Sequence, residues 1–248
     1  MKVSIITATY NSSQTIIDTI KSLEEQTYSN IEYIIIDGAS KDNTLELIKE
    51  NCTKVSIIIS EPDKGIYDAL NKGISVSTGD IVGFLHSDDI FAYPEAIEDL
   101  VKTLETNQSQ AVYADLEYVS KENIKNVIRK WTSGYYKYSK LKKGWMPPHP
   151  TFYMKRELYN IYGKFDLGFK ISADYDSLLR YLWSNKVSIS YLPKVVTKMR
   201  IGGESNRSLM NILKKTKEDI RALKKNNISW FYPVIMKNIS KLPQFIKK

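Results

Sequence analysis

Two adjacent carboxylates, Asp88 and Asp89, are the side chains in this sequence with the clearest potential for chemistry. They follow an apolar run at residues 81–85, whose length and composition predict a strand buried on both faces of a parallel sheet. Such sheets bind ligands at the carboxyl ends of their strands. Because adjacent negative charges repel and oxygen ligands suit hard cations, the pair predicts a Mg²⁺ or Mn²⁺ site. The alternative is a turn in which an Asp caps the next helix, near residues 93–95.

The elements that position these carboxylates alternate between strand and helix. Strand patterns occur at residues 3–7, 31–36, 55–59 and 81–85. Between them, apolar residues recur at helical spacing, in the sets Ile16, Ile20 and Leu23; Leu45, Ile48 and Cys52; and Ile66, Leu70 and Ile74. This alternation predicts an α/β fold with a mostly parallel, right-handed βαβ sheet flanked by helices. The first two strand ends would then form a nucleotide pocket beside Asp88 and Asp89.

The kind of nucleotide is limited by what the loops lack. The turn at residues 7–13 contains no glycine, and the chain has neither a G-x-G-x-x-G nor a G-x-x-x-x-G-K-[ST] motif. NAD enzymes and P-loop NTPases are therefore disfavoured. The remaining candidates are Tyr10 and Asp37, whose carboxylate could accept hydrogen bonds from a base or ribose. In isolation Asp37-Gly38 is more often an ordinary turn, and the nucleotide role gains weight only because Asp88 and Asp89 offer a metal for a diphosphate.

Composition favours one domain of α/β size, with or without an appendage, because the chain has 248 residues. The single cysteine, Cys52, excludes an intrachain disulfide and indicates a reducing compartment. Residues 1–7 are too short for a signal-peptide core, and no run approaches the roughly 18 apolar residues of a membrane span. The sequence thus predicts a cytoplasmic protein.

The net charge of +8 is concentrated at the C-terminus. Residues 207–248 carry 11 Lys and Arg against 2 Asp and Glu, whereas the rest of the chain has 25 basic and 26 acidic residues. A nearly neutral body with a basic tail indicates an appendage for a phosphate-rich surface rather than a property of the fold.

Five motifs in order make the chain resemble a family 2 glycosyltransferase of the GT-A fold, of the type that builds bacterial polysaccharides such as O-antigen and colanic acid. The resemblance covers about residues 1–205. The motifs are Thr7-Ala-Thr-Tyr-Asn11, Asp37-Gly-Ala-Ser-Lys-Asp-Asn-Thr44, Glu61-Pro-Asp-Lys-Gly-Ile-Tyr-Asp-Ala-Leu-Asn-Lys-Gly73, His86-Ser-Asp-Asp89 and Ser172-Ala-Asp-Tyr-Asp176.

This resemblance implies a role for each motif. Ala8, Tyr10 and Asp37 would hold the nucleotide, Asp88 the sugar-nucleotide, Asp89 a Mn²⁺ or Mg²⁺ ion, and Asp174 would be catalytic. Two departures from the family pattern affect the site. His86 stands where many members have Asp or Asn, so Asp89 becomes the main metal ligand, with Asp88 and His86 as further candidates. Leu70 stands where many have Arg, so Lys64, Lys72 or Arg200 could neutralise the diphosphate instead.

The implied reaction is inverting transfer of a sugar from a nucleotide-sugar to a hydroxyl of a glycan or lipid-linked glycan. UDP is the favoured nucleotide because it is common in the family, and GDP and dTDP sugars remain open. The acceptor hydroxyl needs a carboxylate to take its proton during attack on the anomeric carbon. Asp174 is the candidate base. It precedes a helix predicted at residues 177–183, where an acidic residue could also act as an N-cap, a role that suits Asp176 better.

An aromatic-rich segment at residues 120–150 separates the two acidic sites and could form an acceptor-side lid, since aromatic rings stack on sugars. Its aromatic residues are Trp131, Tyr135, Tyr136, Tyr138 and Trp145. We expect Trp145 and His149 to contact the acceptor. The alternative is that these rings cover the rim of the domain and that His149 is structural.

These features divide the chain into a catalytic domain at residues 1–205 and a basic helical tail at 206–248. Residues 1–115 would bind the nucleotide-sugar and residues 116–205 the acceptor. In the tail, Leu209, Ile212, Leu213, Ile220 and Leu223 could share one helical face among lysines, which predicts peripheral binding to an anionic cytoplasmic membrane surface. That face could instead pack on the body or on a second subunit.

The alternative function is an inactive nucleotide-sugar-binding or RNA-binding protein. RNA recognition would require aromatic residues on adjacent strands with basic residues around them, but the predicted central strands carry Ile, Val and Leu. We therefore expect no nucleic acid partner.

Overall fold

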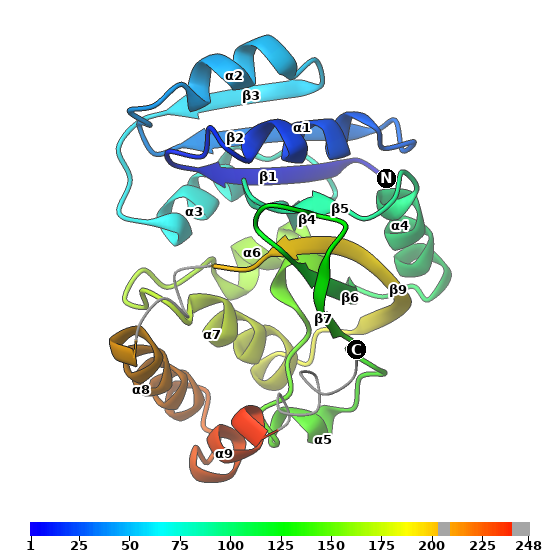
Figure 1. Cartoon of the computed structure of the whole chain (residues 1–248). Helices are drawn as coiled ribbons and strands as arrows, with labels where there is room; N and C mark the ends of the chain where they lie inside the picture. The colour runs from blue at the N-terminus through cyan, green and yellow to red at the C-terminus, as the bar shows by residue number, and fades with distance from the viewer. Residues whose placement is uncertain (203–208, 240–248) are drawn as a thin grey trace.

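The first half of the chain alternates strand and helix, as the sequence predicts (Figure 1). The computed structural model describes residues 1–202 and 209–239. The strands are β1 (Val3–Thr9), β2 (Ile31–Asp37), β3 (Val55–Ser60) and β4 (Ile81–Phe84). The helices between them are α1 (Ile16–Glu24), α2 (Thr44–Asn51) and α3 (Ile66–Val76). The predicted order of elements is therefore confirmed, with ends that differ by a few residues.

The central sheet of the described chain has the strand order β3-β2-β1-β4-β8-β6-β9-β5, and β7 pairs with β6. The later strands are β5 (Ile90–Phe91), β6 (Ala111–Val119), β7 (Val127–Trp131), β8 (Tyr153–Lys155) and β9 (Ile189–Arg200). β4 is interior and fully buried, as expected, and runs parallel to β1. Its other neighbour, β8, is antiparallel, so the sheet is mostly rather than wholly parallel. Tyr153 of β8 packs so closely that a Cβ on Gly83 would lie 2.0 Å from its ring.

The strand order reverses between β1 and β4, which is where open α/β sheets bind ligands. Thr9 at the end of β1 is in register with Asp37 at the end of β2. The loop after β4, which contains Asp88 and Asp89, leaves the sheet at the same edge. β6 and β9 also run parallel to β4, so Val119 and Arg200 reach this edge as well. We call it the catalytic edge.

Helices bury apolar residues against both faces of the sheet. On one face, α1, α2 and α4 (Ala96–Thr106) pack against β1, β2 and β4. On the other, α3, α6 (Arg156–Tyr162) and α7 (Ala173–Leu179) form the second core. The remaining short elements are α5 (Tyr138–Leu141), a 3₁₀ turn at His149–Thr151 and a π turn at Arg180–Ser184.

The helix after the second acidic motif begins at Ala173, earlier than the predicted start at residue 177. Asp176 is therefore inside α7 rather than at its N-cap, which corrects the role considered for it. Its buried carboxylate accepts hydrogen bonds from Lys225 at 3.2 Å and from Asn226 at 3.3 Å. Asp176 thus ties α7 to the C-terminal part of the chain.

Two C-terminal helices, α8 (Leu209–Lys225) and α9 (Phe231–Ile239), complete the described structure. Ala222 and Leu223 are buried in the same core as α7. Glu218 accepts hydrogen bonds from the backbone N–H groups of Lys170, Ile171 and Ser172. α8 is therefore docked on the catalytic body.

The apolar residues predicted to share one face of this helix do not share one environment. Leu223 is fully buried, whereas Ile212 is 45% exposed and Leu213 is 59% exposed. Packing on the body, the alternative considered for this face, accounts for Leu223 but not for Ile212 and Leu213.

The predicted boundary between domain and tail, at residues 205 and 206, lies outside the described residues, as do the last tail residues, 240–248. The division into a domain and a tail therefore stays a prediction. None of the helices within residues 1–202 and 209–239 combines the length and the apolar character that crossing a membrane requires.

Candidate active site

Asp89 is a buried carboxylate at the carboxyl end of β4, with 1% of its surface exposed. Neither carboxylate oxygen has a hydrogen-bond partner in the described structure. Burial and the neighbouring Asp88 charge raise the pKa of Asp89 well above its usual range, although the backbone N–H and the charge of Arg200 partly offset them. A buried carboxylate with no donor at hydrogen-bond distance is costly to ionise unless a cation neutralises it. The local chemistry therefore fits a cation ligand.

Only a few side chains at this site could coordinate a metal ion. The described residues contain no group of three or more His, Cys, Asp or Glu side chains that could hold a metal ion. Asp89 and the adjacent, half-buried Asp88 could supply one or two carboxylates. This number suits Mg²⁺ or Mn²⁺, which proteins commonly bind through one or two carboxylates together with substrate phosphates and water. The alternative is only half realised: the Asp89 N–H donates to the His86 carbonyl oxygen at 2.9 Å and closes a turn, but the residue at the N-cap of α4 is Glu95, not an Asp.

Arg200, predicted to contact the nucleotide-sugar, is instead 5% exposed beneath the Asp88–Asp89 loop. Its guanidinium donates to the Asp88 carbonyl oxygen at 2.9 Å and to the carboxylate of Asp18, on α1, at 2.5 Å. The end of β9 therefore fixes the backbone of the acidic loop. Arg200 therefore supports the acidic loop through a backbone contact, a role that the sequence did not indicate.

A pocket of about 300 Å³ adjoins this loop at the ends of β1 and β4. Two predicted nucleotide-binding residues, Ala8 and Tyr10, line it, and the Tyr10 side chain is 55% exposed. The other lining residues come from β1, from the loop before α3, from α3 itself and from the loop after β4: Thr9, Ser12, Asp63, Gly65, Ile66, Ala69 and Ser87. An exposed aromatic ring above a polar-lined pocket can stack on a nucleotide base.

Asp37 does not line this pocket, although it was predicted to contact the nucleotide. It is fully buried, and its oxygens accept hydrogen bonds from the Ser40 hydroxyl, the Ser40 N–H and the Ser60 hydroxyl. In the described conformation Asp37 therefore holds the ends of β2 and β3 together.

The acidic residue that does reach the pocket is Asp63, which the sequence reading did not single out. Its carboxylate oxygen would lie only 2.6 Å from a Cβ added to Gly38, so the small residue after Asp37 leaves the space that Asp63 occupies. The Asp-Lys-Gly turn at residues 63–65 was the available signal. Lys64, in the same turn, has an exposed side chain and is absent from the pocket lining.

Asp174 lies in the first turn of α7 and is half-buried. One carboxylate oxygen accepts a hydrogen bond from the Tyr175 N–H at 2.7 Å and a longer one from the Tyr67 hydroxyl at 3.4 Å. The single Tyr67 hydroxyl proton is shared with the Ile171 carbonyl oxygen, which at 2.7 Å is the nearer acceptor. Because Tyr67 is on α3, the helix that lines the nucleotide pocket also positions Asp174.

Two titratable side chains place Asp174 close to the acidic loop. Burial lowers the pKa of His86, while the charges of Asp88 and Asp174 both raise it. Burial raises the pKa of Tyr118, and the charges of Asp89 and Asp174 raise it further, against the effect of Arg129. His86 and Tyr118 therefore each lie near both acidic motifs, which are 85 residues apart in the sequence. The fold brings the predicted metal ligands and the predicted base into one site.

Burial also raises the pKa of Asp174, although Lys237, the Tyr175 N–H and Lys215 act against this rise. A carboxylate with a raised pKa is a stronger base when it is ionised. The environment of Asp174 thus suits proton abstraction.

His149, predicted to contact the acceptor, is instead 7% exposed and stacks on Phe84 with ring centroids 5.0 Å apart. Burial and nearby His86 lower the pKa of His149 to about 3, so it is neutral at physiological pH. The His86 ring lies 6.3 Å from it. His149 is therefore a buried packing residue between Phe84 and His86, which favours the structural alternative.

The aromatic segment does not form a single lid. Trp131 stacks with Tyr118 near the catalytic edge, at a centroid distance of 6.5 Å. Trp145 packs against Tyr113 and Tyr136, and its indole N–H donates to the Ser133 carbonyl oxygen at 3.0 Å. This inward packing does not support the acceptor contact predicted for Trp145.

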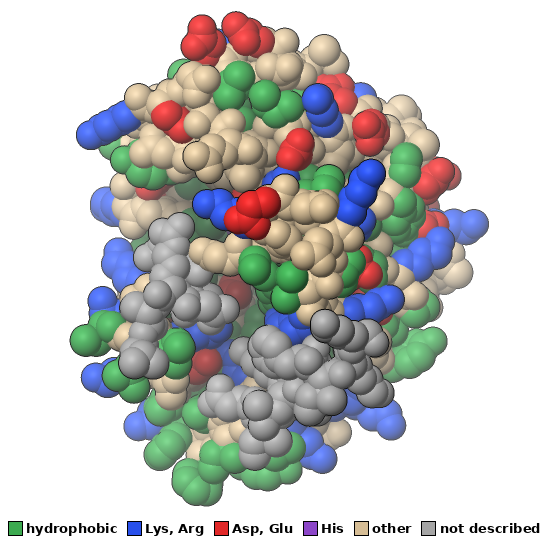
Figure 2. All heavy atoms as spheres, viewed as in Figure 1, with side chains coloured by type: hydrophobic (Ala, Val, Ile, Leu, Met, Phe, Trp, Pro, Cys, Tyr) green, Lys and Arg blue, Asp and Glu red, His purple; other side chains and the backbone are tan. Residues whose placement is uncertain are grey.

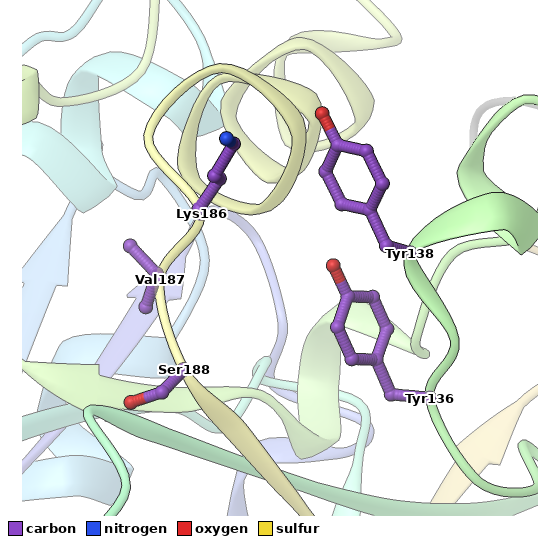
Figure 3. A pocket seen from close by; sticks show the side chains of 5 residues that line it. All are labelled: Tyr136, Tyr138, Lys186, Val187 and Ser188. Atoms are coloured by element: carbon purple, nitrogen blue, oxygen red, sulfur yellow. The ribbon is translucent and has the colours of Figure 1, made fainter.

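Tyr136 and Tyr138 face Lys186, Val187 and Ser188 across a second pocket of about 400 Å³ (Figure 3). The last of these residues comes just before the start of β9, and Ile189 pairs with Ala111 at the start of β6. This pocket is therefore at the amino ends of β6 and β9, opposite the catalytic edge. A lid over the carboxylates cannot be built from these two tyrosines.

The chain matches a protein-family model, several relatives and several solved structures. The family model described as Glycosyl transferase family 2 matches residues 4–162, which include the nucleotide pocket and Asp89 but not Asp174 or Arg200. The chain is 31% identical over 189 residues to an uncharacterized glycosyltransferase, Rv1514c, of Mycobacterium tuberculosis, covering 72% of this chain and 68% of that protein.

A second relative carries a more specific name. It is the UDP-Glc:alpha-D-GlcNAc-diphosphoundecaprenol beta-1,3-glucosyltransferase WfgD of Escherichia coli. The two sequences are 28% identical over 205 residues, covering 82% of this chain and 78% of WfgD.

Among solved structures, TarS of Staphylococcus aureus superposes with a TM-score of 0.71 at 19% identity, over 99% of this chain. The chain spans 43% of that TarS chain. A shorter TarS structure, comprising residues 1–349 in complex with UDP-GlcNAc, superposes with a TM-score of 0.68 at 20% identity, covering 99% of this chain and 79% of that one. At these identities the likeness concerns the fold.

Proposed function

The chain belongs to glycosyl transferase family 2, and from this membership we propose that it transfers a sugar with inversion from a nucleotide-sugar to a hydroxyl of a glycan or lipid-linked glycan. UDP is the favoured nucleotide, because the name of WfgD and the TarS complex both refer to a UDP-sugar. The observation that carries the proposal is that Asp174 lies near the same two side chains as the acidic loop: its charge acts on the pKa of His86 together with Asp88, and on the pKa of Tyr118 together with Asp89.

In this proposal the nucleotide occupies the pocket at the ends of β1 and β4. Tyr10 would stack on the base, and Asp63 could accept a hydrogen bond from the base or ribose. The diphosphate would then lie against the Asp88–Asp89 loop, whose backbone Arg200 holds in place. Asp37 supports the loops around the nucleotide through Ser40 and Ser60.

Asp89, with Asp88 beside it, would hold Mg²⁺ or Mn²⁺. The bound ion would offset the negative charge that develops on the departing diphosphate. Asp89 is suited to this task because its two oxygens are buried and have no donor among the described residues. Arg200 restrains the loop, so the carboxylate is oriented before the donor binds.

Asp174 would act as the general base. The acceptor oxygen forms a bond to the anomeric carbon, the bond between that carbon and the diphosphate oxygen breaks, and the hydroxyl proton passes to Asp174. Attack from the side opposite the leaving diphosphate inverts the anomeric configuration. Tyr67 and the Tyr175 N–H hold the carboxylate for this step.

Calorimetry with nucleoside diphosphates tests the donor site. In the presence of Mn²⁺ we expect UDP to bind more tightly than GDP or dTDP, and Tyr10→Ala to weaken UDP about tenfold through loss of base stacking, a contact worth about 1–3 kcal/mol. Tyr135→Ala is a matched control, because Tyr135 is 71% exposed and lies outside the pocket lining. Equal UDP affinity in both variants would place the nucleotide elsewhere.

We also propose that the C-terminal helices rest on an anionic cytoplasmic membrane surface, where a lipid-linked acceptor would be within reach. Apolar side chains on these helices, and Trp230 just before α9, are exposed: Met210, Ile212, Leu213, Trp230, Phe231, Tyr232 and Ile235. Figure 2 shows hydrophobic side chains beside Lys and Arg over the part of the surface formed by α8 and α9. Aromatic and basic residues together suit a membrane interface, with about 1 kcal/mol per basic residue from anionic lipid.

Vesicle binding tests this surface with point variants, because removing α8 would also remove core residues Ala222 and Leu223. We expect salt-sensitive co-sedimentation of the intact chain with phosphatidylglycerol vesicles, and a severalfold loss in the double variant Phe231→Ser, Ile235→Ser. Ile161→Ser is the control, since Ile161 is 65% exposed on α6. Equal sedimentation of the double variant and the control, or no sedimentation of the intact chain, would refute membrane docking through α9.

A further inference from the structure

α8 and α9 carry basic side chains to the start of α7, where Asp174 lies. Lys215 and Asp219 are one turn apart on α8 and so share a face. Asp219 accepts a hydrogen bond at 2.9 Å from Lys237 of α9. The Lys237 ammonium lies 3.5 Å from the centroid of the ring of Tyr175, the residue after Asp174. Figure 1 shows the two helices on the side of the molecule that carries α7.

Lys215 differs from Lys237 in having no counter-ion at bonding distance. It is half-buried, and no hydrogen bond or ion pair joins it to another residue of the described chain. Burial lowers the pKa of the Lys215 ammonium, and Lys237 and Arg129 lower it further, whereas Asp219 and Asp174 raise it. Asp219 and Asp174 offset part of this cost, but neither forms an ion pair with Lys215, so an anion bound directly to the ammonium would stabilise its charged form.

Arg129 approaches the same place from the sheet. It lies on β7 opposite Tyr118 of β6, and its guanidinium is 3.9 Å from the centroid of the Tyr118 ring. Tyr118 in turn lies near Asp89 and Asp174. Lys215 of α8 and Lys237 of α9 therefore lie near Asp174, and Arg129 of β7 contacts Tyr118, which also lies near Asp174. We call these three side chains the basic cluster.

The position of the basic cluster indicates which substrate it serves. The nucleotide pocket is formed by β1, α3 and the loop after β4. None of the cluster residues lines that pocket. The Asp174 carboxylate is close to His86 of the acidic loop and also to Lys215 of the cluster. A group bound by the cluster would thus be on the acceptor side of the proposed base.

We propose that Lys215 and Arg129 form a phosphate-binding subsite for the acceptor, which carries a phosphate or diphosphate ester near the hydroxyl that receives the sugar. This inference rests on the proposed transferase function. Arg supplies a planar fork of N–H donors and Lys a compact charge, both suited to phosphate oxygens. Lys237 is already paired with Asp219 and positions α8, so it is a supporting residue.

Binding of octyl phosphate tests the subsite without knowledge of the acceptor sugar. Octyl glucoside is the uncharged ligand of equal chain length, and both are titrated into full-length protein saturated with UDP and Mn²⁺. We expect octyl phosphate to bind more tightly than octyl glucoside, and Lys215→Ala and Arg129→Ala each to weaken it about tenfold, the value of one charge-assisted hydrogen bond. Lys217→Ala is the matched control, because Lys217 is exposed on another side of α8.

Two further arms separate the possible sources of the phosphate. UDP affinity and sedimentation with phosphatidylglycerol vesicles should both be unchanged in Lys215→Ala. Loss of UDP affinity would assign the cluster to the donor diphosphate, and loss of vesicle binding would assign it to lipid headgroups; either result overturns the subsite. Equal octyl phosphate affinity in Lys215→Ala and Lys217→Ala would also overturn it. Failure of the wild-type protein to bind UDP would instead contradict the proposed transferase function, which distinguishes the two failures.

Discussion

Asp89→Ala is expected to abolish turnover of the nucleotide-sugar while leaving the protein folded. The variant loses the two buried carboxylate oxygens that lack donors in the described structure, and with them the main ligand for Mg²⁺ or Mn²⁺. Losing several kcal/mol of charge stabilisation would slow the reaction about a thousandfold or more. The measurement is release of nucleoside diphosphate from the donor, with and without EDTA. Glu46→Ala, which removes an exposed carboxylate on α2, is the control.

Thermal unfolding provides an independent readout for the same residue. Burial raises the pKa of Asp89, so the folded state binds its proton more tightly than the unfolded state, and this contribution to stability is lost as pH rises through the raised pKa. At neutral pH without metal, Asp89→Asn should therefore unfold no lower than the wild type. Mn²⁺ should raise the wild-type Tm but not that of Asp89→Asn. Full turnover in EDTA would rule out the metal role.

Asp174→Asn is expected to bind the nucleotide-sugar almost normally and to transfer the sugar poorly. The amide keeps the shape of the carboxylate but cannot take the acceptor proton, and removal of a general base typically costs about 10² to 10⁴ in rate. Calorimetry gives the donor affinity and a transfer assay gives the rate. Wild-type transfer by Asp174→Asn would assign the base to another residue.

The pH profile and a neighbouring variant sharpen this test. Burial raises the pKa of Asp174, and the base must be ionised, so the wild-type rate should fall as pH decreases through that raised value. Asp174→Asn should lose this acidic limb. Asp176→Asn is the contrasting variant: Asp176 contacts Lys225 and Asn226, so its loss should lower the Tm more than it changes the shape of the pH profile.

The sequence predicted those parts of the fold that depend on local patterns. Regular alternation up to residue 85 located β1 to β4 and the helices between them, and the apolar run before Asp88 placed the acidic loop at a strand end. The later half lacks this regularity. Short strands there pair with strands that are distant in the sequence, as β8 does with β4. Because β8 has only three residues, it is too short to show an alternating pattern that would predict this pairing.

Site residues were predicted less well where their roles depend on contacts between distant segments. Arg200 binds the Asp88 carbonyl across 112 positions, and Ser60 satisfies Asp37 from 23 positions away. Neither bond leaves a local signal, so the sequence did not indicate that Arg200 and Asp37 make these contacts. The stacking of His149 on Phe84 likewise depends on tertiary packing, which its Pro-flanked position does not reveal.

The most direct measurement of the central claim is a crystal structure with Mn²⁺ and an unreactive UDP-sugar analogue. We predict a uracil ring at Tyr10, a diphosphate joined through Mn²⁺ to Asp89, and an anomeric carbon with Asp174 on the side opposite the diphosphate. A nucleotide bound away from the ends of β1 and β4, or a diphosphate without contact to the Asp88–Asp89 loop, would contradict the account. The account would also be contradicted if Asp174 did not lie on the side of the anomeric carbon opposite the diphosphate.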